Sequence, residues 1–197
     1  MLPRGAVTSC LLVVSMTALA QGQPQSGVEA FRRNNHRLAA KLLPLEASRG
    51  DAEAQADLGS LLMAGEFVPQ DFTTGAFWLK RSAAQGYGPG CFLLGMAYFH
   101  GWGVDHDWKM AAPFFKLAAL KGIRPAEFQL GIIYYLPFGG TQDKIESHAW
   151  FNVAAAHGVD GAANARDLVE KELKMTPSEI LLAQARAQEI FAQEQSK

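Results

Sequence analysis

The amino-acid sequence predicts an all-α fold, a right-handed solenoid of helix-turn-helix repeats. The first observation behind this prediction is a 36-residue period in the glycines, which recur at Gly50, Gly86, Gly122 and Gly158 and, each after a leucine, at Gly59, Gly95 and Gly131. The second is that three further columns keep the same period: Asp71, Asp107 and Asp143; Trp78, Phe114 and Trp150; Ala83, Ala119 and Ala155. A fixed period of this length indicates stacked helical units that share one core.

The composition excludes several classes of protein. The chain has 197 residues, of which 49% are hydrophobic and 19% are charged, and its formal net charge is -1. A chain of this kind is too apolar to be disordered, and it lacks the basic surface that nucleic-acid binding requires. We therefore expect a folded protein without a nucleic-acid partner.

Residues 1–20 have the features of a cleavable secretory signal peptide. Arg4 supplies a positive charge before the apolar run Cys10–Leu19, and Ala18-Leu19-Ala20 has the small-x-small pattern of a cleavage site after Ala20. The run has about half of the roughly 20 residues that span a bilayer, although an uncleaved anchor is the alternative. We expect a periplasmic or secreted protein whose mature chain has no membrane span and begins with a polar linker at 21–27.

Each repeat is expected to be a helix, a loop and a second helix. In the first unit Asp51 is placed to cap a helix that runs to about Ala64, and Asp71 is placed to cap the second helix. Gly86 then ends the second helix, since glycine is favoured in the left-handed position after a helix. Gly59 has no side chain, which allows the second helix to approach closely. Residues 28–49 are interpreted as an N-terminal helical half-repeat and 50–157 as three complete repeats.

Residues 158–197 are expected to form a terminal helix and a C-terminal capping helix. Thr176-Pro177-Ser178-Glu179 matches a capping box with proline at the first helical position. An apolar stripe follows it, made of Ile180, Ala183, Ala187, Ile190 and Phe191. Arg186 is expected on the solvated face of the same helix. Such a helix would cover the otherwise exposed end of the stack.

The repeat resembles the Sel-one-like repeat family, a branch of the tetratricopeptide-like helical repeats. The segment 91–121 carries the family pattern in Leu94-Gly95, Tyr98, Gly101-x-Gly103-Val104, Asp107 and Ala118-Ala119. The sequence departs from the pattern at Pro113, where we expect a kink in the second helix of the middle unit. The resemblance implies a non-catalytic adaptor for protein–protein interaction, in which the first helix of each unit lines a concave groove that binds a peptide.

Aligning the Leu-Gly pairs with the family implies a set of side chains that face this groove. They are Met63, Phe92, Met96, Phe99, His100, Phe128, Ile132 and Tyr135. Methionine and aromatic side chains suit an adaptable peptide groove, so we expect another protein or peptide of the cell envelope to bind here. The alternative for Phe92 and Phe128 is that they pack between repeats. The sequence leaves the oligomeric state open.

Motifs for catalysis and metal binding are absent from the sequence. There is no Gly-Lys pair for a phosphate-binding loop and no G-x-S-x-G elbow, and the five histidines show no H-E-x-x-H or short ligand cluster. We therefore expect no enzyme activity, no cofactor and no metal. A cysteine-rich branch of the family is associated with β-lactam binding or hydrolysis, but the mature chain has a single cysteine, Cys91, which we interpret as inert. A regulator of a signalling or secretion system is the other alternative.

Overall fold

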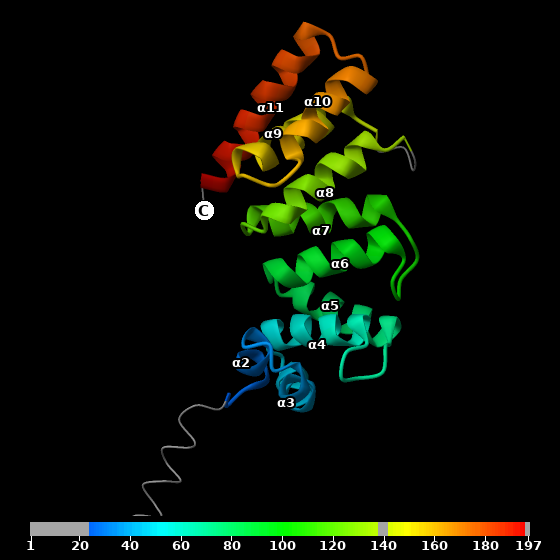
Figure 1. Ribbon diagram of the computed structural model, residues 1–197, viewed down its shortest axis with the longest axis vertical. Helices are drawn as coiled ribbons and strands as arrows, with labels where there is room; N and C mark the ends of the chain where they lie inside the picture. The colour runs from blue at the N-terminus through cyan, green and yellow to red at the C-terminus, as the bar shows by residue number, and fades with distance from the viewer. Residues whose placement is uncertain (1–23, 138–141, 196–197) are drawn as a thin grey trace, which may run out of the picture.

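The computed structural model describes residues 24–137 and 142–195, so the proposed signal peptide lies outside the described residues. Within them all regular structure is helical, with ten helices and no strand. The helices stack along the long axis of the molecule, from the N-terminal helices at one end to the C-terminal helices at the other (Figure 1). This arrangement confirms the predicted all-α solenoid.

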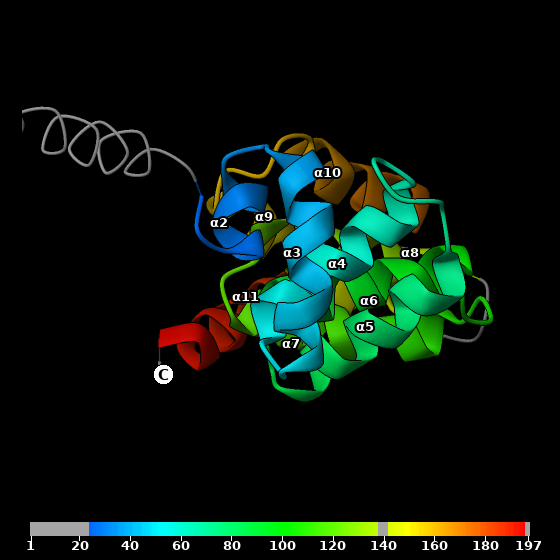
Figure 2. The same cartoon turned by 90° about the horizontal axis from the view of Figure 1, so that it is seen from below.

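Three helix pairs form the body of the stack. The helices are α2 (Gly27–Arg32), α3 (His36–Ser48), α4 (Ala52–Ala64), α5 (Phe72–Ala84), α6 (Gly88–His100), α7 (Trp108–Leu120), α8 (Arg124–Tyr135), α9 (Lys144–Ala156), α10 (Ala162–Glu172) and α11 (Pro177–Gln195). Within a unit α4 packs on α5, α6 on α7 and α8 on α9, and the units join through α5 with α6 and α7 with α8. The first helices α4 and α6 also contact each other, as the view along the stack shows (Figure 2).

The periodic aspartates cap the second helix of each unit, as predicted. The Asp71 carboxylate accepts a hydrogen bond from the backbone N–H of Thr74 at 2.9 Å, and Asp107 and Asp143 cap α7 and α9 in the same way. A cap of this kind satisfies a backbone donor that the first helical turn leaves free. The predicted helix start at Asp51 is also confirmed, because its side chain accepts from the N–H of Ala54 at 2.7 Å.

The Leu-Gly pairs mark points where the two helices of a unit approach closely. A Cβ atom at Gly59 would lie 2.8 Å from Cγ of Leu79, and one at Gly131 would lie 2.6 Å from the ring of Phe151. Both distances are shorter than a van der Waals contact. The glycine in each pair therefore sets the separation between the helices, which confirms the predicted role of Gly59.

The N-terminal region contains two helices, which the sequence analysis did not separate. The break falls at Asn34, whose φ of 57° is left-handed, and Asn35 then caps α3. The linker assigned to 21–27 also ends earlier than expected, since Ser26 caps α2 and Gly27 is its first residue. In the middle unit, α7 is continuous from Trp108 to Leu120, with Pro113 inside it.

Helix α11 folds back along α9 and closes the C-terminal end (Figure 1). Its capping box is formed as predicted: the N–H of Thr176 donates to Glu179 at 2.8 Å, and the N–H of Glu179 donates to the Thr176 hydroxyl at 3.3 Å. Arg186, which was expected on the solvated face, is partly exposed, and its guanidinium pairs with Glu146 of α9 at 2.5 Å. The apolar side of α11 is buried through Ala183, Ala187 and Ile190.

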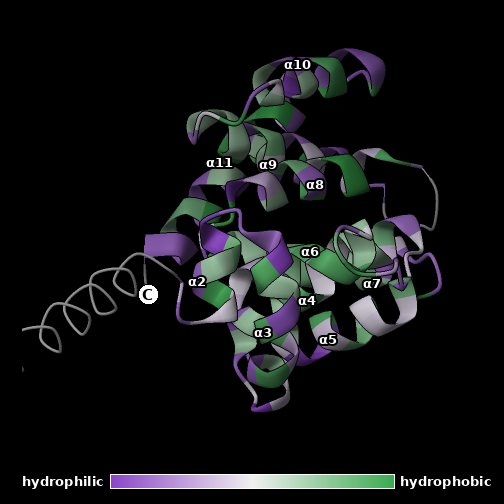
Figure 3. Ribbon diagram, turned by 60° about the horizontal axis from the view of Figure 1, so that its bottom comes forward, coloured by the Kyte–Doolittle hydropathy of each residue, from purple (hydrophilic) through white to green (hydrophobic). Residues whose placement is uncertain are grey.

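Helix α6 is the apolar centre of the stack. It contains no Asp, Glu, Lys or Arg, and it is largely green in the hydropathy view (Figure 3). Leu94 and Ala97 on α6 are buried in the larger of two core clusters, which also contains residues of α4, α7 and α8. No helix in residues 24–137 and 142–195 is both long and apolar enough to cross a bilayer.

Candidate functional site

The side chains predicted to line a groove lie on α4, α6 and α8, the first helices of the three units. Met63 is on α4, Phe92, Met96, Phe99 and His100 are on α6, and Phe128, Ile132 and Tyr135 are on α8. His100 is exposed, whereas the other seven are partly buried. The structure brings some of them together at one pocket and uses others for packing.

Phe92 and Phe128 pack inside their own units. The ring of Phe92 lies 5.8 Å from that of Phe115 on α7, and the ring of Phe128 lies 5.2 Å from that of Phe151 on α9. Each phenylalanine therefore connects the two helices of one repeat. Aromatic pairs at this separation stabilise a fold beyond the area that they bury.

A pocket of about 450 Å³ lies between α4 and α6, where the first two units meet. It is lined by Ser60, Met63, Ala64, Gln70, Phe72, Leu93, Met96 and Trp102. Met63 and Met96 are the two predicted groove residues that the structure brings together here. Most of the lining side chains are apolar, and methionines can repack around side chains of different shape.

The rim of this pocket is aromatic, and the sequence analysis missed it. Trp102 stacks on His100 with ring centroids 4.4 Å apart and lies 6.2 Å from the ring of Phe72. The turn that carries Trp102 depends on its neighbours, because Gly101 and Gly103 have φ values of 74° and 68°. The Gly-Trp-Gly sequence was the available signal, since two glycines allow a left-handed turn that few other residues tolerate.

An acidic group lies one helical turn before the pocket. Asp57 on α4 is partly buried, and its Oδ2 atom is shielded from solvent without a hydrogen-bond partner among the described residues. Burial and then the nearby Glu53 carboxylate raise the pKa of Asp57 to about 7, against the opposing effect of Arg32. Burial also raises the pKa of Tyr87, which precedes α6, to about 12, with Glu53 and Asp57 adding to the effect.

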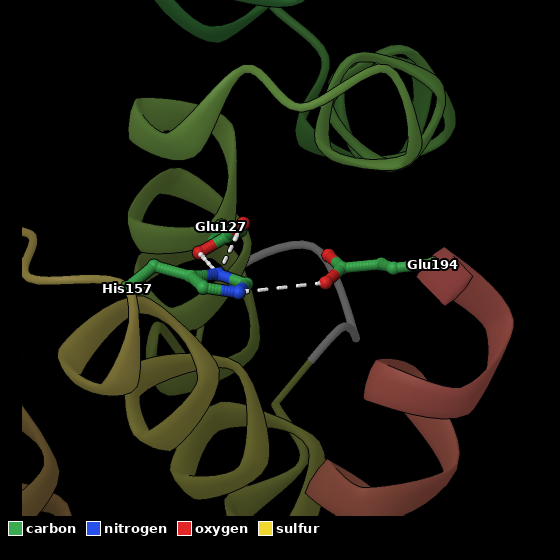
Figure 4. Close-up of side chains that lie close together, drawn as sticks. All are labelled: Glu127, His157 and Glu194. Atoms are coloured by element: carbon green, nitrogen blue, oxygen red, sulfur yellow. Dashed lines mark hydrogen bonds and ion pairs between the residues drawn. The ribbon is translucent and has the colours of Figure 1, made fainter.

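A second cluster of titratable side chains joins α8, α9 and α11. Glu127 is fully buried, and both of its carboxylate oxygens lie 3.0 Å from Nδ1 of His157, while Nε2 of His157 lies 3.7 Å from Glu194 (Figure 4). The three residues each offer one ligand atom, and these atoms lie within 4.8 Å of one another. One imidazole and two carboxylates are donors that a zinc ion accepts.

The guanidinium of Arg124 already supplies positive charge to this cluster. Its Nη1 atom lies 3.1 Å from Glu127, 2.7 Å from His157 and 3.8 Å from Glu194. A cation thus balances the carboxylates without a metal ion, so we interpret the cluster as an ion-pair network that fastens α11 to the last repeat. These residues are far apart in sequence, and sequence spacing gave no signal for them.

The first and third units carry a polar pair at equivalent positions, and in each pair the member on the first helix is buried. Gln55 and Gln85 are hydrogen-bonded at 2.9 Å, and Glu127 and His157 occupy the equivalent positions two repeats later. At the equivalent position of the middle unit lies Cys91, which is buried. Burial raises the pKa of its thiol, while the charge of Lys121 acts to lower it. The raised pKa agrees with the interpretation of Cys91 as an inert residue.

The fold and the pocket together define a class of protein, a short helical-repeat solenoid with a pocket between its first two units. The Sel1 repeat model matches residues 52–87, 88–123 and 124–159, each beginning at the first residue of α4, α6 or α8. The match covers more than half of the chain, so the chain belongs to the Sel1 repeat family. Proteins of this family commonly serve as scaffolds for protein–protein interaction.

Two solved structures resemble this fold. One is c5321, described as a protective antigen present in uropathogenic Escherichia coli with an SLR fold, at 29% identity and a TM-score of 0.72 over 81% of this chain and 34% of that protein. The other is a Sel1 repeat protein from Oxalobacter formigenes, at 21% identity and a TM-score of 0.67 over 81% of this chain and 66% of that protein. The chain thus spans about a third of the first and about two thirds of the second. No curated protein matches the sequence significantly.

Proposed function

We propose that this protein is an exported, non-catalytic adaptor that binds a peptide or protein segment at the pocket between α4 and α6. The observation that carries the proposal is the pocket itself, where Met63, Leu93 and Met96 form an apolar surface under the exposed ring of Trp102. A hollow apolar surface beside an exposed aromatic ring favours a partner that brings its own apolar side chain.

The expected mechanism is stoichiometric binding by a surface that is already formed. Helices α4 and α6 are held by their own units and by direct contact with each other. A partner therefore loses its own freedom on binding but does not need to order the pocket, which reduces the entropy cost of association. The envelope is the proposed setting because residues 1–20 have the features of a signal peptide.

Site-specific photo-crosslinking tests the binding site. A photoreactive phenylalanine analogue in place of Met96 is expected to capture a partner in intact cells. The same analogue in place of Leu181, which is 67% exposed on α11, is the matched control on another part of the surface. Equal products at both positions, or no product at Met96, would contradict binding at this pocket. Hydrolysis of nitrocefin by the purified protein would contradict its non-catalytic character.

Export is tested separately by the mass of the protein in cell fractions. The expected result is a periplasmic or secreted form whose mass lacks residues 1–20. A variant with Val13→Asp and Val14→Asp interrupts the apolar run and is expected to keep its full mass inside the cell. A full-length periplasmic protein would instead indicate an uncleaved anchor.

A further inference from the structure

We propose that the occupant of this pocket is a peptide segment of a partner protein that pairs one basic side chain with a bulky apolar side chain, the basic group binding Asp57. The inference rests on the proposed function, because it names the chemistry of the segment that the adaptor binds. It is carried by the position of Asp57 relative to the pocket and by the state of its carboxylate.

Asp57 and the pocket share one face of α4. Asp57, Ser60 and Ala64 are spaced by three and four residues, which places them in line on a helix. Ser60 and Ala64 line the pocket. A helix advances about 1.5 Å per residue, so Asp57 lies about 10 Å from Ala64 along α4. An extended peptide covers that distance in about three residues.

The Asp57 carboxylate has an acceptor that the protein itself does not use. Its Oδ2 atom is shielded from solvent and has no hydrogen-bond partner within residues 24–137 and 142–195. The ionised form of Asp57 is therefore costly in the free protein, and an ammonium or guanidinium group of a ligand that reached this partly exposed side chain would stabilise it. The neighbouring Arg32 does not do so, because its guanidinium makes two hydrogen bonds to Glu53.

The charges around Asp57 favour a basic ligand. The groups that act on it or lie beside it are Asp51 and Glu53 on the α4 side, Glu46 on α3, Arg32 on α2 and Tyr87 before α6. Three carboxylates, those of Asp51, Glu53 and Glu46, thus act on the Asp57 carboxylate, against the positive charge of one arginine. This excess of negative charge at one end of an apolar pocket complements a segment that is basic at one end and apolar at the other.

Selection from a random-peptide phage library tests the inference on the purified protein. We expect the native protein to enrich peptides that carry Lys or Arg about three residues from a bulky apolar residue. The Asp57→Asn variant preserves the shape of the side chain and is expected to retain the apolar enrichment but lose the basic one. Leu181→Ser, which changes an exposed apolar residue away from the pocket, is the control and should select like the native protein.

The outcomes separate this inference from the proposed function. If Asp57→Asn keeps the basic enrichment, or if the native protein enriches apolar residues alone, the basic-segment inference is wrong and the adaptor proposal stands. If the native protein selects no differently from a Met63→Ser and Met96→Ser double variant, the pocket binds no peptide and both proposals fail. Circular dichroism of each variant establishes that it is folded.

Affinity measurements on the most enriched peptide give a second readout. Replacing its basic residue with Gln is expected to weaken binding to the native protein about tenfold and to leave binding to Asp57→Asn unchanged. Because Asp57 has a pKa of about 7, the ionised fraction falls between pH 8 and pH 6, and affinity should fall roughly tenfold with it. A native protein whose affinity is equal at both pH values would overturn the inference.

Discussion

The guanidinium of Arg124 lies 3.1 Å from the carboxylate of Glu127, which has no exposure to solvent. Arg124 itself is 45% exposed, so the pair places a buried negative charge under a positive group at the surface. Glu194 of α11 completes the arrangement from the other side, at 3.8 Å from Arg124. The end of the capping helix is therefore fastened to the last repeat by charge as well as by apolar packing.

Removing Arg124 is expected to destabilise the protein more than removing Glu127. Arg124→Met leaves a buried carboxylate with less positive charge beside it, and because Arg124 is 45% exposed we expect a cost below the about 3–5 kcal/mol that is typical of a fully buried pair. Glu127→Gln removes the charge itself, so we expect a smaller loss and a double variant close to Glu127→Gln alone. Urea unfolding measures all three free energies.

Arg33→Met is the control for these variants, because Arg33 pairs with Glu29 at the surface of α2. Its cost is expected to be about 0.5 kcal/mol or less, as is usual for exposed pairs. Equal costs for Arg33→Met and Arg124→Met would contradict the importance of the buried network.

Gly131→Ala is expected to force apart the helices of the third unit. The new Cβ would lie 2.6 Å from the Phe151 ring, and overpacking of this kind typically costs about 1–3 kcal/mol. Phe151→Leu should create the missing space, so the double variant is expected to lose less stability than the sum of the single variants. Strictly additive losses in a thermal or urea unfolding cycle would show that the close approach does not matter.

Asp57→Asn is expected to stabilise the protein at neutral and alkaline pH. The pKa of Asp57 is about 7 in the fold against 3.8 for the free side chain, so the folded state holds a proton that the unfolded state releases between these values. The native protein should therefore lose stability as the pH rises from about 4 to 7, by up to a few kcal/mol at about 1.4 kcal/mol per unit. The variant lacks this loss, and urea midpoints across that range measure the difference. Parallel pH curves for the two proteins would contradict the prediction.

Acid is expected to weaken the start of α11 through Glu179. A hydrogen bond from Lys144 and another from the backbone of Thr176 lower the pKa of Glu179 to about 2. The stability that they provide is present above the unfolded pKa of about 4.5 and is lost as the pH falls toward 2.

Glu179→Gln should therefore unfold more easily than the native protein at pH 6, and the two should converge as the pH approaches 2. Urea midpoints at both pH values measure this. Glu172→Gln, at an exposed position on α10, is the control and should follow the native protein at each pH. A gap between Glu179→Gln and the native protein that persists in acid would argue against the ion pair as its cause.

The sequence predicted the features of the fold that depend on local chemistry. The caps at Asp71, Asp107 and Asp143 and the capping box at Thr176 involve neighbours three residues away, and their residue types identify them. The close approach of α5 to α4 at Gly59 was predictable, because a glycine that recurs in the first helix of each repeat leaves room for the second helix. The break at Asn34 was missed, although asparagine tolerates the left-handed conformation found there.

The candidate sites were harder to predict because they depend on packing between units. The family frame identified Met63 and Met96, but it could not show that Phe92 and Phe128 turn toward their own second helices. The unused oxygen of Asp57 arises from burial by α4 and its neighbours, which a single sequence does not show.

One buried position on the first helix differs in chemistry between the three units. Gln55 with Gln85 is an amide pair, Cys91 lies near the ammonium of Lys121, and Glu127 with His157 is a carboxylate–imidazole pair completed by Glu194. A duplicated or exchanged unit would keep the 36-residue register of its helices. Both members of the amide pair and of the carboxylate–imidazole pair would move with their unit, whereas Glu194 lies on α11 and contacts the third unit alone among these pairs. The helical frame is therefore modular, but the third unit is matched to the capping helix.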